Sequence, residues 1–383
     1  MAVLVLFVVA MVHASILEGW RKRIIDVSNT SAGGDHETPD VFVSAIIPAR
    51  NAATTLVPLL QDLHAQRYSK ERCEVIVVDD HSEDGTAAIV TGMMRTWPQL
   101  RLIAAEGEGK KNAITKGVLE AKGELILITD ADTRCGPGRM SALAGNWRSS
   151  QADLVLMPVG TIGGDGLLAM LQREEQLALQ GVTAGSALDG TPMLANGANI
   201  AFAREMFFVV NGFQGDPWAS GDDMLLLKRA LENGRKVSYL LDPGTLVTTA
   251  PEVTWRSFIA QRIRWAGKMR AYPNTSGFVA GLFAFLLPWG LIAATVLVVR
   301  NVSVGESALY TWTLLLGAWL SWSLPVLRLV NSMRAFIGSS DADPSVVKNA
   351  MRTLFALAAF AVYASAIAIA SVFIRPMWKG RTI

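Results

Sequence analysis

Two aspartates one residue apart, Asp130 and Asp132, follow the apolar run Leu125–Thr129. The run has the length and composition of a buried strand, so we expect both carboxylates at a strand end. Hard cations such as Mg²⁺ and Mn²⁺ prefer oxygen ligands, and this pair could hold one of them against a diphosphate group. An isolated Asp-x-Asp triplet is usually a solvated turn, but its position after a buried strand favours a metal or nucleotide site.

A second acidic pair, Asp79 and Asp80, also follows an apolar run, Val75–Val78. One of these carboxylates could accept hydrogen bonds from a ribose or a base. The alternative is local, because Ser82 or Asp84 could cap the helix that begins after this turn. Both interpretations can hold at once, since one acid can face a ligand while the turn caps the helix.

Lys110 lies in the glycine-containing segment 107–113, ahead of an expected helix. A lysine at this point could contact a phosphate or a base, although most lysines are simply solvated. The spacing of the glycines is not that of a nucleoside-triphosphate-binding loop.

A third acidic pair, Asp222 and Asp223, follows Gly221 and precedes the amphipathic segment Met224–Leu231. Either acid could simply cap the helix. A carboxylate here could instead act as general base on an acceptor hydroxyl, where its pKa and its position both matter.

The segment Trp255–Met269 has apolar residues at helical spacing. At about 100° per residue, four other side chains gather on the opposite face: Gln261, Arg264, Trp265 and Lys268. We expect a helix in the membrane surface, with its apolar side in lipid and this face toward the soluble domain. Arginine suits a diphosphate, and a tryptophan face can stack on a sugar ring. A generic basic helix beside the membrane is the alternative.

The elements that must position these residues alternate along the chain. Short β-branched or apolar runs are separated by helical stretches; the expected strands are Val41–Ile47, Val75–Val78, Leu100–Ala104 and Leu125–Thr129, and the first expected helix is Thr54–Gln66. This alternation predicts a mainly parallel sheet with helices on both faces. Ligands bind at the carboxyl ends of the strands in such sheets, and the acidic pairs lie at those ends.

Bulk composition excludes several classes of protein. The 383 residues carry a formal charge of only +2, without a basic stripe in the central region, which argues against nucleic-acid binding. Two cysteines, Cys73 and Cys135, indicate neither a disulfide framework nor a cysteine zinc site, and we expect reduced thiols facing the cytosol. The hydrophobic content of 51% is concentrated at the two ends of the chain.

Three C-terminal stretches are long and apolar enough to span a bilayer: Gly277–Val299, Ala308–Leu327 and Leu354–Ile374. Residues 1–20 contain a shorter apolar run followed by Arg21, Lys22 and Arg23. Positive charge after the run favours an anchor with its N-terminus outside and the following chain in the cytosol. A leader cleaved near Ala14 is the alternative.

We therefore expect five regions along the chain. They are an N-terminal anchor (1–20), a flexible linker (28–40), a catalytic domain (41–250), a surface helix (251–276), and three membrane helices with a tail (277–383). The basic loop Arg328–Arg352 should be cytosolic. The tail conflicts with that arrangement, because Arg375, Lys379 and Arg381 would then lie outside.

The three acidic pairs and the segment Gln261–Trp265 follow one another in an order that resembles a family 2 glycosyltransferase. The resemblance covers about Val41–Tyr272 and the membrane spans that follow. It is similar to the membrane branch that contains cellulose, hyaluronan, chitin and poly-N-acetylglucosamine synthases and ceramide glucosyltransferases. The resemblance implies a GT-A fold, with a mixed, mainly parallel sheet in an α/β domain. It also implies an inverting hexosyltransferase that displaces the nucleotide directly at the anomeric carbon.

The resemblance also implies roles for individual residues. Five would bind the nucleotide sugar: Asp79, Asp80, Lys110, Asp130 and Arg264. Asp130 and Asp132 would hold Mg²⁺ or Mn²⁺, Asp223 would be the catalytic base, and three residues would bind the acceptor: Asn199, Gln261 and Trp265. The chain departs from the family at Gly221-Asp222-Asp223, where Thr-Glu-Asp is common.

Two functions follow from the resemblance. The first is transfer from a nucleotide sugar, by family a UDP-sugar, to a lipid or lipid-linked acceptor at the cytosolic face of the cell (inner) membrane. The second is a processive polysaccharide synthase of the cell envelope, with partner subunits, because four spans are few for a polymer channel. A non-catalytic scaffold would be expected to lose charged site residues, whereas Asp130, Asp132, Asp223 and Arg264 are all present. The sequence does not identify the sugar.

Overall fold

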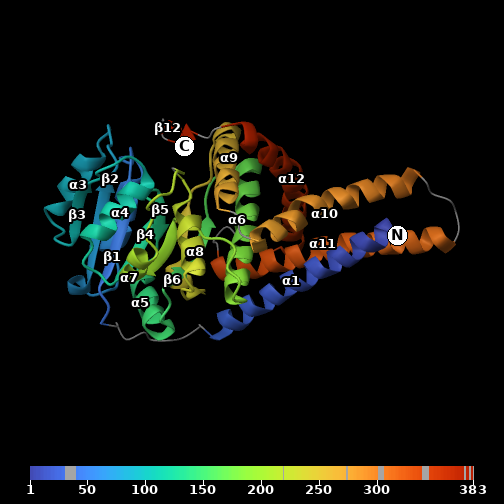
Figure 1. The fold of residues 1–383 in the computed structure, drawn as a ribbon, viewed down its shortest axis with the longest axis horizontal. Helices are drawn as coiled ribbons and strands as arrows, with labels where there is room; N and C mark the ends of the chain where they lie inside the picture. Colours follow the sequence, from blue (N-terminus) through green and yellow to red (C-terminus); the bar gives the residue numbers. More distant parts are fainter. Residues whose placement is uncertain are drawn as a thin grey trace.

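The structure is a computed structural model that describes residues 1–30, 40–218, 220–272, 275–300, 306–338, 345–374, 377–378 and 381–382. It comprises an α/β domain and a group of long helices that extends away from it (Figure 1). Most of the expected linker lies outside the described residues, but its first residues, 28–30, are helical and continue the N-terminal helix.

A seven-stranded sheet organises the α/β domain in the order β3-β2-β1-β4-β8-β6-β9. The strands are β1 (Val43–Ala49), β2 (Cys73–Asp79), β3 (Leu100–Ala104), β4 (Leu125–Thr129), β6 (Leu154–Leu156), β8 (Asn199–Ala203) and β9 (Val237–Tyr239). Strands β1 to β4 are parallel, and β8 is antiparallel to both of its neighbours. The expected mixed, mainly parallel sheet is confirmed.

A small second sheet lies at the edge of the domain, in the order β5-β10-β7. Its strands are β5 (Thr133–Cys135), β7 (Val159–Thr161) and β10 (Val247–Thr249). Because β5 begins directly after Asp132, this sheet fixes the loop that carries both aspartates of the Asp-x-Asp triplet.

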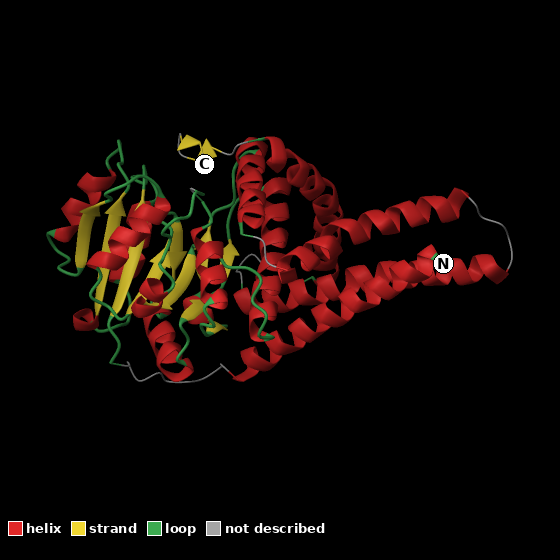
Figure 2. Ribbon diagram, viewed as in Figure 1, coloured by secondary structure: helices red, strands yellow, loops and turns green. Residues whose placement is uncertain are grey.

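Helices cover both faces of the large sheet (Figure 2). They are α2 (Leu56–His64), α3 (Thr86–Met94), α4 (Lys110–Glu120), α5 (Arg139–Ser150), α6 (Gly166–Leu188), α7 (Arg204–Val209) and α8 (Asp222–Glu232), with short 3₁₀ turns at Lys70–Arg72 and Pro243–Thr245. The central strands are buried on both sides, and successive residues alternate between two cores. Ile46 and Ile126, for example, face one core, whereas Ala45 and Leu127 face the other.

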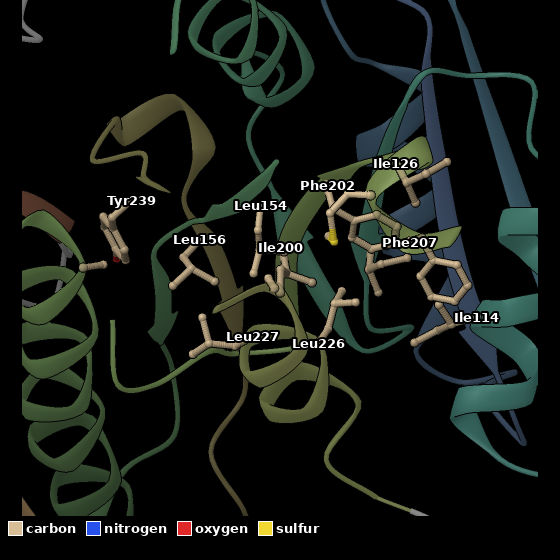
Figure 3. Close-up of a cluster of buried hydrophobic side chains, with 14 of the residues drawn as sticks. Ile114, Ile126, Leu154, Leu156, Ile200, Phe202, Phe207, Leu226, Leu227 and Tyr239 are labelled. Atoms are coloured by element: carbon tan, nitrogen blue, oxygen red, sulfur yellow. The ribbon is translucent and has the colours of Figure 1, made fainter. Parts of the chain in front are cut away.

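The core under α8 fixes the start of that helix. Leu226 and Leu227 of α8 are almost fully buried and face the strand residues Ile200 and Leu156 (Figure 3). Burial of a leucine side chain contributes about 1.5–3 kcal/mol, so this packing holds α8 firmly on the sheet. The acidic residues in the first turn of α8 are positioned as a consequence.

The long helices are α1 (Ala2–Thr30), α9 (Trp255–Ala271), α10 (Thr275–Arg300), α11 (Glu306–Ile337) and α12 (Val346–Phe373). In Figure 1, α1, α10 and α11 extend away from the sheet, and the N-terminus lies at the far end. Helix α12 instead packs on α9, α6, α10 and α11, closer to the α/β domain. The C-terminal strands β11 (Met377–Trp378) and β12 (Arg381–Thr382) lie toward the sheet.

Three helical segments are long and apolar enough to cross a membrane: Ala2–Asn29, Ala308–Ile337 and Val346–Phe373. A further apolar segment, Phe285–Arg300, belongs to α10, which contains the expected span Gly277–Val299. Helix α1 is longer than the expected anchor because Trp20 and Ile24 are buried against the α/β domain. Gly185 of α6 permits this contact, since a Cβ there would lie 2.4 Å from the Cβ atom of Trp20.

Candidate active site

A cavity of about 850 Å³ lies between the carboxyl ends of the parallel strands and the helices α6, α8, α9, α10 and α12. It brings together residues from five sequence motifs: Asp80, Lys110, Asp130, Asp132, Asp223 and Arg264. Gln261 and Trp265 of α9 also line it. Asp79 and Asn199 are the two expected site residues that do not.

Lys110 joins two of the acidic pairs. Its Nζ atom lies 2.8 Å from a carboxylate oxygen of Asp130 and 3.0 Å from one of Asp222. Burial alone would lower the pKa of Lys110, but the carboxylates of Asp130, Asp222 and Asp223 raise it. The ammonium group therefore stays charged and acts as a fixed bridge between the end of β4 and the start of α8.

The region around Asp130 carries more negative than positive charge. Burial raises the pKa of Asp130; the nearby Lys110 lowers it, and the Asp132 and Asp222 carboxylates raise it further. A divalent cation would balance this surplus, and the available donors are all oxygens, as Mg²⁺ and Mn²⁺ prefer. In the described part of the chain no three acidic, histidine or cysteine side chains form a complete metal cage. The two carboxylates Asp130 and Asp132 thus fit a cation that takes its remaining ligands from water and diphosphate.

The two acids of the pair Asp79-Asp80 have different surroundings: one lines the cavity, and the other supports the turn that follows. Asp80 is only 2% exposed, lines the cavity, and accepts a hydrogen bond of 3.0 Å from the Gly109 N–H. Asp79 instead accepts from the Ser82 N–H at 3.3 Å and stabilises the turn. Asp84 caps the following turn by accepting from the Thr86 N–H at 3.0 Å. Asp79 thus stabilises the turn, and its contact with the nucleotide stays a prediction.

Asp223 lies at the first turn of α8 with little exposed surface. Its carboxylate accepts a hydrogen bond of 3.0 Å from the Gly197 N–H, and the Lys268 Nζ lies 3.2 Å from both of its oxygens. Gly197 must be small, because a Cβ there would lie 2.8 Å from an Asp222 oxygen and 2.9 Å from the Lys110 Nζ. Asp223 is thus held in a fixed position that faces the cavity.

A buried cluster that the sequence reasoning missed holds the loop before these acids. The Lys111 Nζ donates to the Tyr272 hydroxyl at 2.7 Å and also contacts the Asp216 carboxylate, to which Tyr272 donates at 2.6 Å. The Tyr272 ring lies against Gly221, where a Cβ would approach it to 2.4 Å. Tyr272 follows Lys268 by one helical turn, and that spacing is the signal that could have found it.

Helix α9 presents the expected polar face to the cavity, through Gln261, Arg264 and Trp265. Burial lowers the pKa of Arg264, which nevertheless stays charged, and among the described residues it has no acidic partner within 4.0 Å. A cation in such a position suits an anionic ligand. The opposite face is not simply in lipid as expected, because Phe258 is only 1% exposed and packs against Tyr363 of α12.

Asn199 was expected to bind the acceptor, but its side chain faces the interior. It is 1% exposed, accepts a hydrogen bond of 2.7 Å from the guanidinium of Arg139, and donates to the carbonyls of Pro158 and Thr245. Asn196, three residues earlier, lines the cavity instead. The expectation failed because the strand begins at Asn199, and the preceding turn supplies the residues that reach the cavity.

Residues 44–208 match the family model described as "Glycosyl transferase family 2". They form a family 2 glycosyltransferase domain. The GT-A fold is likewise supported by a solved mannosyltransferase of Pyrobaculum calidifontis in complex with GDP-Man and Mn²⁺. It superposes with a TM-score of 0.53 at 21% identity and covers 99% of each chain.

Relatives of this chain include a "Probable glycosyltransferase YdaM" of Bacillus subtilis, 26% identical over 58% of this chain and 54% of the relative. An N-acetylglucosaminyltransferase of Rhizobium meliloti is 25% identical over 67% of this chain and 63% of its own length. A dolichyl-phosphate beta-glucosyltransferase of Trichomonas vaginalis is 38% identical over 24% of this chain and 30% of its own length. The chain thus spans less than two thirds of each of these relatives.

Proposed function

We propose that the protein transfers a sugar from a nucleotide sugar to a lipid or lipid-linked acceptor at the cytosolic face of the cell membrane. The observation that carries this proposal is the single cavity, which runs from the acidic end of β4 to the apolar helices α10 and α12. A donor and a membrane-bound acceptor can meet only where a polar site opens toward apolar helices. We propose a UDP-sugar as the donor, on the family resemblance.

The donor end of the cavity suits a nucleotide diphosphate with a cation. Asp130 and Asp132 would hold Mg²⁺ or Mn²⁺, which when bound offsets the charge of the diphosphate and of the departing nucleotide. Asp80 would accept from the nucleoside, and Lys110 and Arg264 would contact the phosphates. The structural relative's complex with GDP-Man and Mn²⁺ agrees with a divalent metal.

The reaction we propose is a single displacement with inversion. The acceptor oxygen attacks the anomeric carbon, and the new C–O bond forms as the bond to the nucleoside diphosphate breaks. Asp223 takes the proton from the acceptor hydroxyl, and Lys268 holds its carboxylate in place 3.2 Å away. Gln261 and Trp265 bind the acceptor sugar or head group.

Two of the relatives act on lipids according to their names. They are the dolichyl-phosphate beta-glucosyltransferase of Trichomonas vaginalis and a beta-monoglucosyldiacylglycerol synthase of Synechocystis, the latter 31% identical over 26% of this chain. The far end of the cavity favours a lipid over a growing polysaccharide, because its lining on α10 and α12 includes Phe285, Phe360 and Ile367. A path for a sugar polymer would need polar groups there.

Product analysis tests the proposal. Membranes from a host that overproduces the protein are incubated with a panel of labelled nucleotide sugars and Mg²⁺ or Mn²⁺. We expect a product extractable into organic solvent, its loss with EDTA, and recovery on adding back the cation. Asp223→Asn should reduce product formation by about 10²–10⁴-fold in a folded protein. A high-mass polymer would instead support the processive synthase, and unchanged turnover of Asp223→Asn would refute the role of Asp223.

A further inference from the structure

We propose that the hydrocarbon chain of the acceptor lipid binds in the apolar end of the cavity, against α10 and α12. This inference rests on the proposed function and specifies its acceptor as a lipid with a long chain. We assign the acceptor's own chain to this end because the apolar end and the donor site are parts of one cavity.

Helix α12 supplies the main wall of this chain site. Its cavity-lining residues are Phe360, Tyr363, Ala364, Ile367 and Ala368, at positions i, i+3, i+4, i+7 and i+8. This spacing places them in one stripe along the helix. Ala364 and Ile367 are each only 7% exposed, so the stripe faces inward rather than toward lipid.

Helix α10 forms the opposite wall and is tied to α12 at one edge. Gly281 and Phe285 of α10 line the cavity, and a Cβ at Gly281 would meet nothing within 4 Å. The Trp289 Nε1 donates to the Ser365 hydroxyl at 2.9 Å. Phe285 of α10 and Phe360 of α12 also stack, with ring centroids 6.1 Å apart, so the two walls contact each other at this edge of the cavity.

The lining of the cavity is charged at one end and apolar at the other, which matches a lipid with a polar head group and a hydrocarbon chain. The charged donor residues come from the strand ends, whereas the residues on α10 and α12 are aromatic or aliphatic. Between them lies a buried ion pair of Arg262 with Glu175, at 2.6 Å. A head group would lie at the charged end beside Asp223 while the chain follows the apolar stripe.

The outer surfaces of the two helices beside the apolar end are themselves apolar. Leu286 of α10 is 63% exposed, and Val362 and Ile369 of α12 are 60% and 65% exposed. These side chains require lipid around them, since large apolar groups gain from leaving water. The apolar end of the cavity is therefore enclosed by helices whose outer faces are suited to contact with lipid.

Tryptophan substitutions on the two faces of α12 test the inference. Ala364→Trp and Ile367→Trp add volume inside the chain site, and Val362→Trp and Ile369→Trp are matched controls on the exposed face. The purified full-length protein in detergent receives a labelled nucleotide sugar, with or without a total lipid extract of the expression host. Transfer is measured as label in the organic phase, and donor hydrolysis as nucleoside diphosphate released without added lipid.

We expect Ala364→Trp and Ile367→Trp to lower transfer to lipid at least tenfold, while donor hydrolysis and both controls stay within twofold of the unmodified protein. Transfer unchanged in the two inward variants would overturn the chain site, even with the proposed function intact. A protein that neither hydrolyses any donor nor labels any product would instead count against the proposed function itself.

Photocrosslinking provides a second measurement that does not depend on turnover or on the tryptophan variants folding. A palmitic acid probe with a diazirine near the end of its chain is irradiated with the unmodified protein. Peptide mapping should place the adduct on residues 360–368, and excess host lipid extract should reduce it. Labelling spread evenly over the exposed faces of α10, α11 and α12 would contradict a defined chain site.

Discussion

At the scale of residues, two asparagines three positions apart have different tasks. Asn199 is buried in hydrogen bonds to Arg139 and two carbonyls, whereas Asn196 lines the cavity. Asn199→Ala leaves buried polar groups unpaired, so we expect it to lower the free energy of unfolding by about 1–3 kcal/mol. Asn196→Ala should lower activity with a smaller loss of stability, because its side chain accepts one hydrogen bond, from the Ala198 N–H within the same turn. Thermal unfolding and transfer assays on both variants check this, and the reverse pattern would restore Asn199 as an acceptor residue.

Tyr272 is a positioning residue, because it acts through the loop that ends at Gly221. Its hydroxyl bonds to Lys111 and Asp216, and its ring limits the space at Gly221. Burial, together with the Asp216 carboxylate, raises the pKa of this hydroxyl, so it is a neutral donor over the working range of pH. Tyr272→Phe keeps the ring and removes the hydroxyl.

We expect Tyr272→Phe to lower kcat about tenfold, the effect of a buried hydrogen bond worth ~1.4 kcal/mol, while KM for the donor is unchanged. The reason is that Asp223, the proposed base, shifts relative to the acceptor. Steady-state kinetics with varied donor measure the two constants separately. A rise in KM with constant kcat would show that the cluster serves donor binding instead.

At the scale of elements, the start of α8 depends on a glycine. Gly221 has φ of +86° and lies against the Tyr272 ring, so Gly221→Ala meets both a strained backbone and a clash. We expect a loss of stability of about 1–3 kcal/mol, together with lower activity. Gly92→Ala in exposed α3 is the matched control; its Cβ meets nothing within 4 Å, and it should stabilise by about 0.5–1 kcal/mol. Denaturant unfolding of both variants measures the difference.

Strands and helices whose apolar residues recur at a regular spacing were predictable from sequence, whereas contacts between elements distant in sequence were not. The strands before Asp79 and Asp130 and the polar face of α9 follow from local pattern, and all appear in the structure. The inward turn of Asn199 depends on Arg139, which is 60 residues away in sequence. The length of α1 likewise depends on Gly185 accepting Trp20. Packing partners of this kind leave no periodic signal.

At the scale of the whole molecule, the position of the basic tail depends on how many helices cross the membrane. Four spans would put both ends of the chain outside. Helices α1, α10 and α11 extend away from the sheet, whereas α12 packs beside α9 and α6. We therefore propose that α1, α10 and α11 cross the membrane and that α12 does not. The N-terminus then lies outside, and the C-terminus lies with the catalytic domain in the cytosol, as its charges favour.

Fusions at the C-terminus decide between these two arrangements. With three crossings, a green fluorescent protein fused after Ile383 should fluoresce in a bacterial host, because it folds in the cytosol, and an alkaline phosphatase fused there should be inactive. With α12 as a fourth crossing the pattern would invert. A fusion after Asp242, within the catalytic domain and beyond α1 alone, is the internal standard, and it should match the C-terminal result. Opposite signals from the two positions would show that α12 spans the bilayer, and the chain site would then lie within the membrane rather than at its surface.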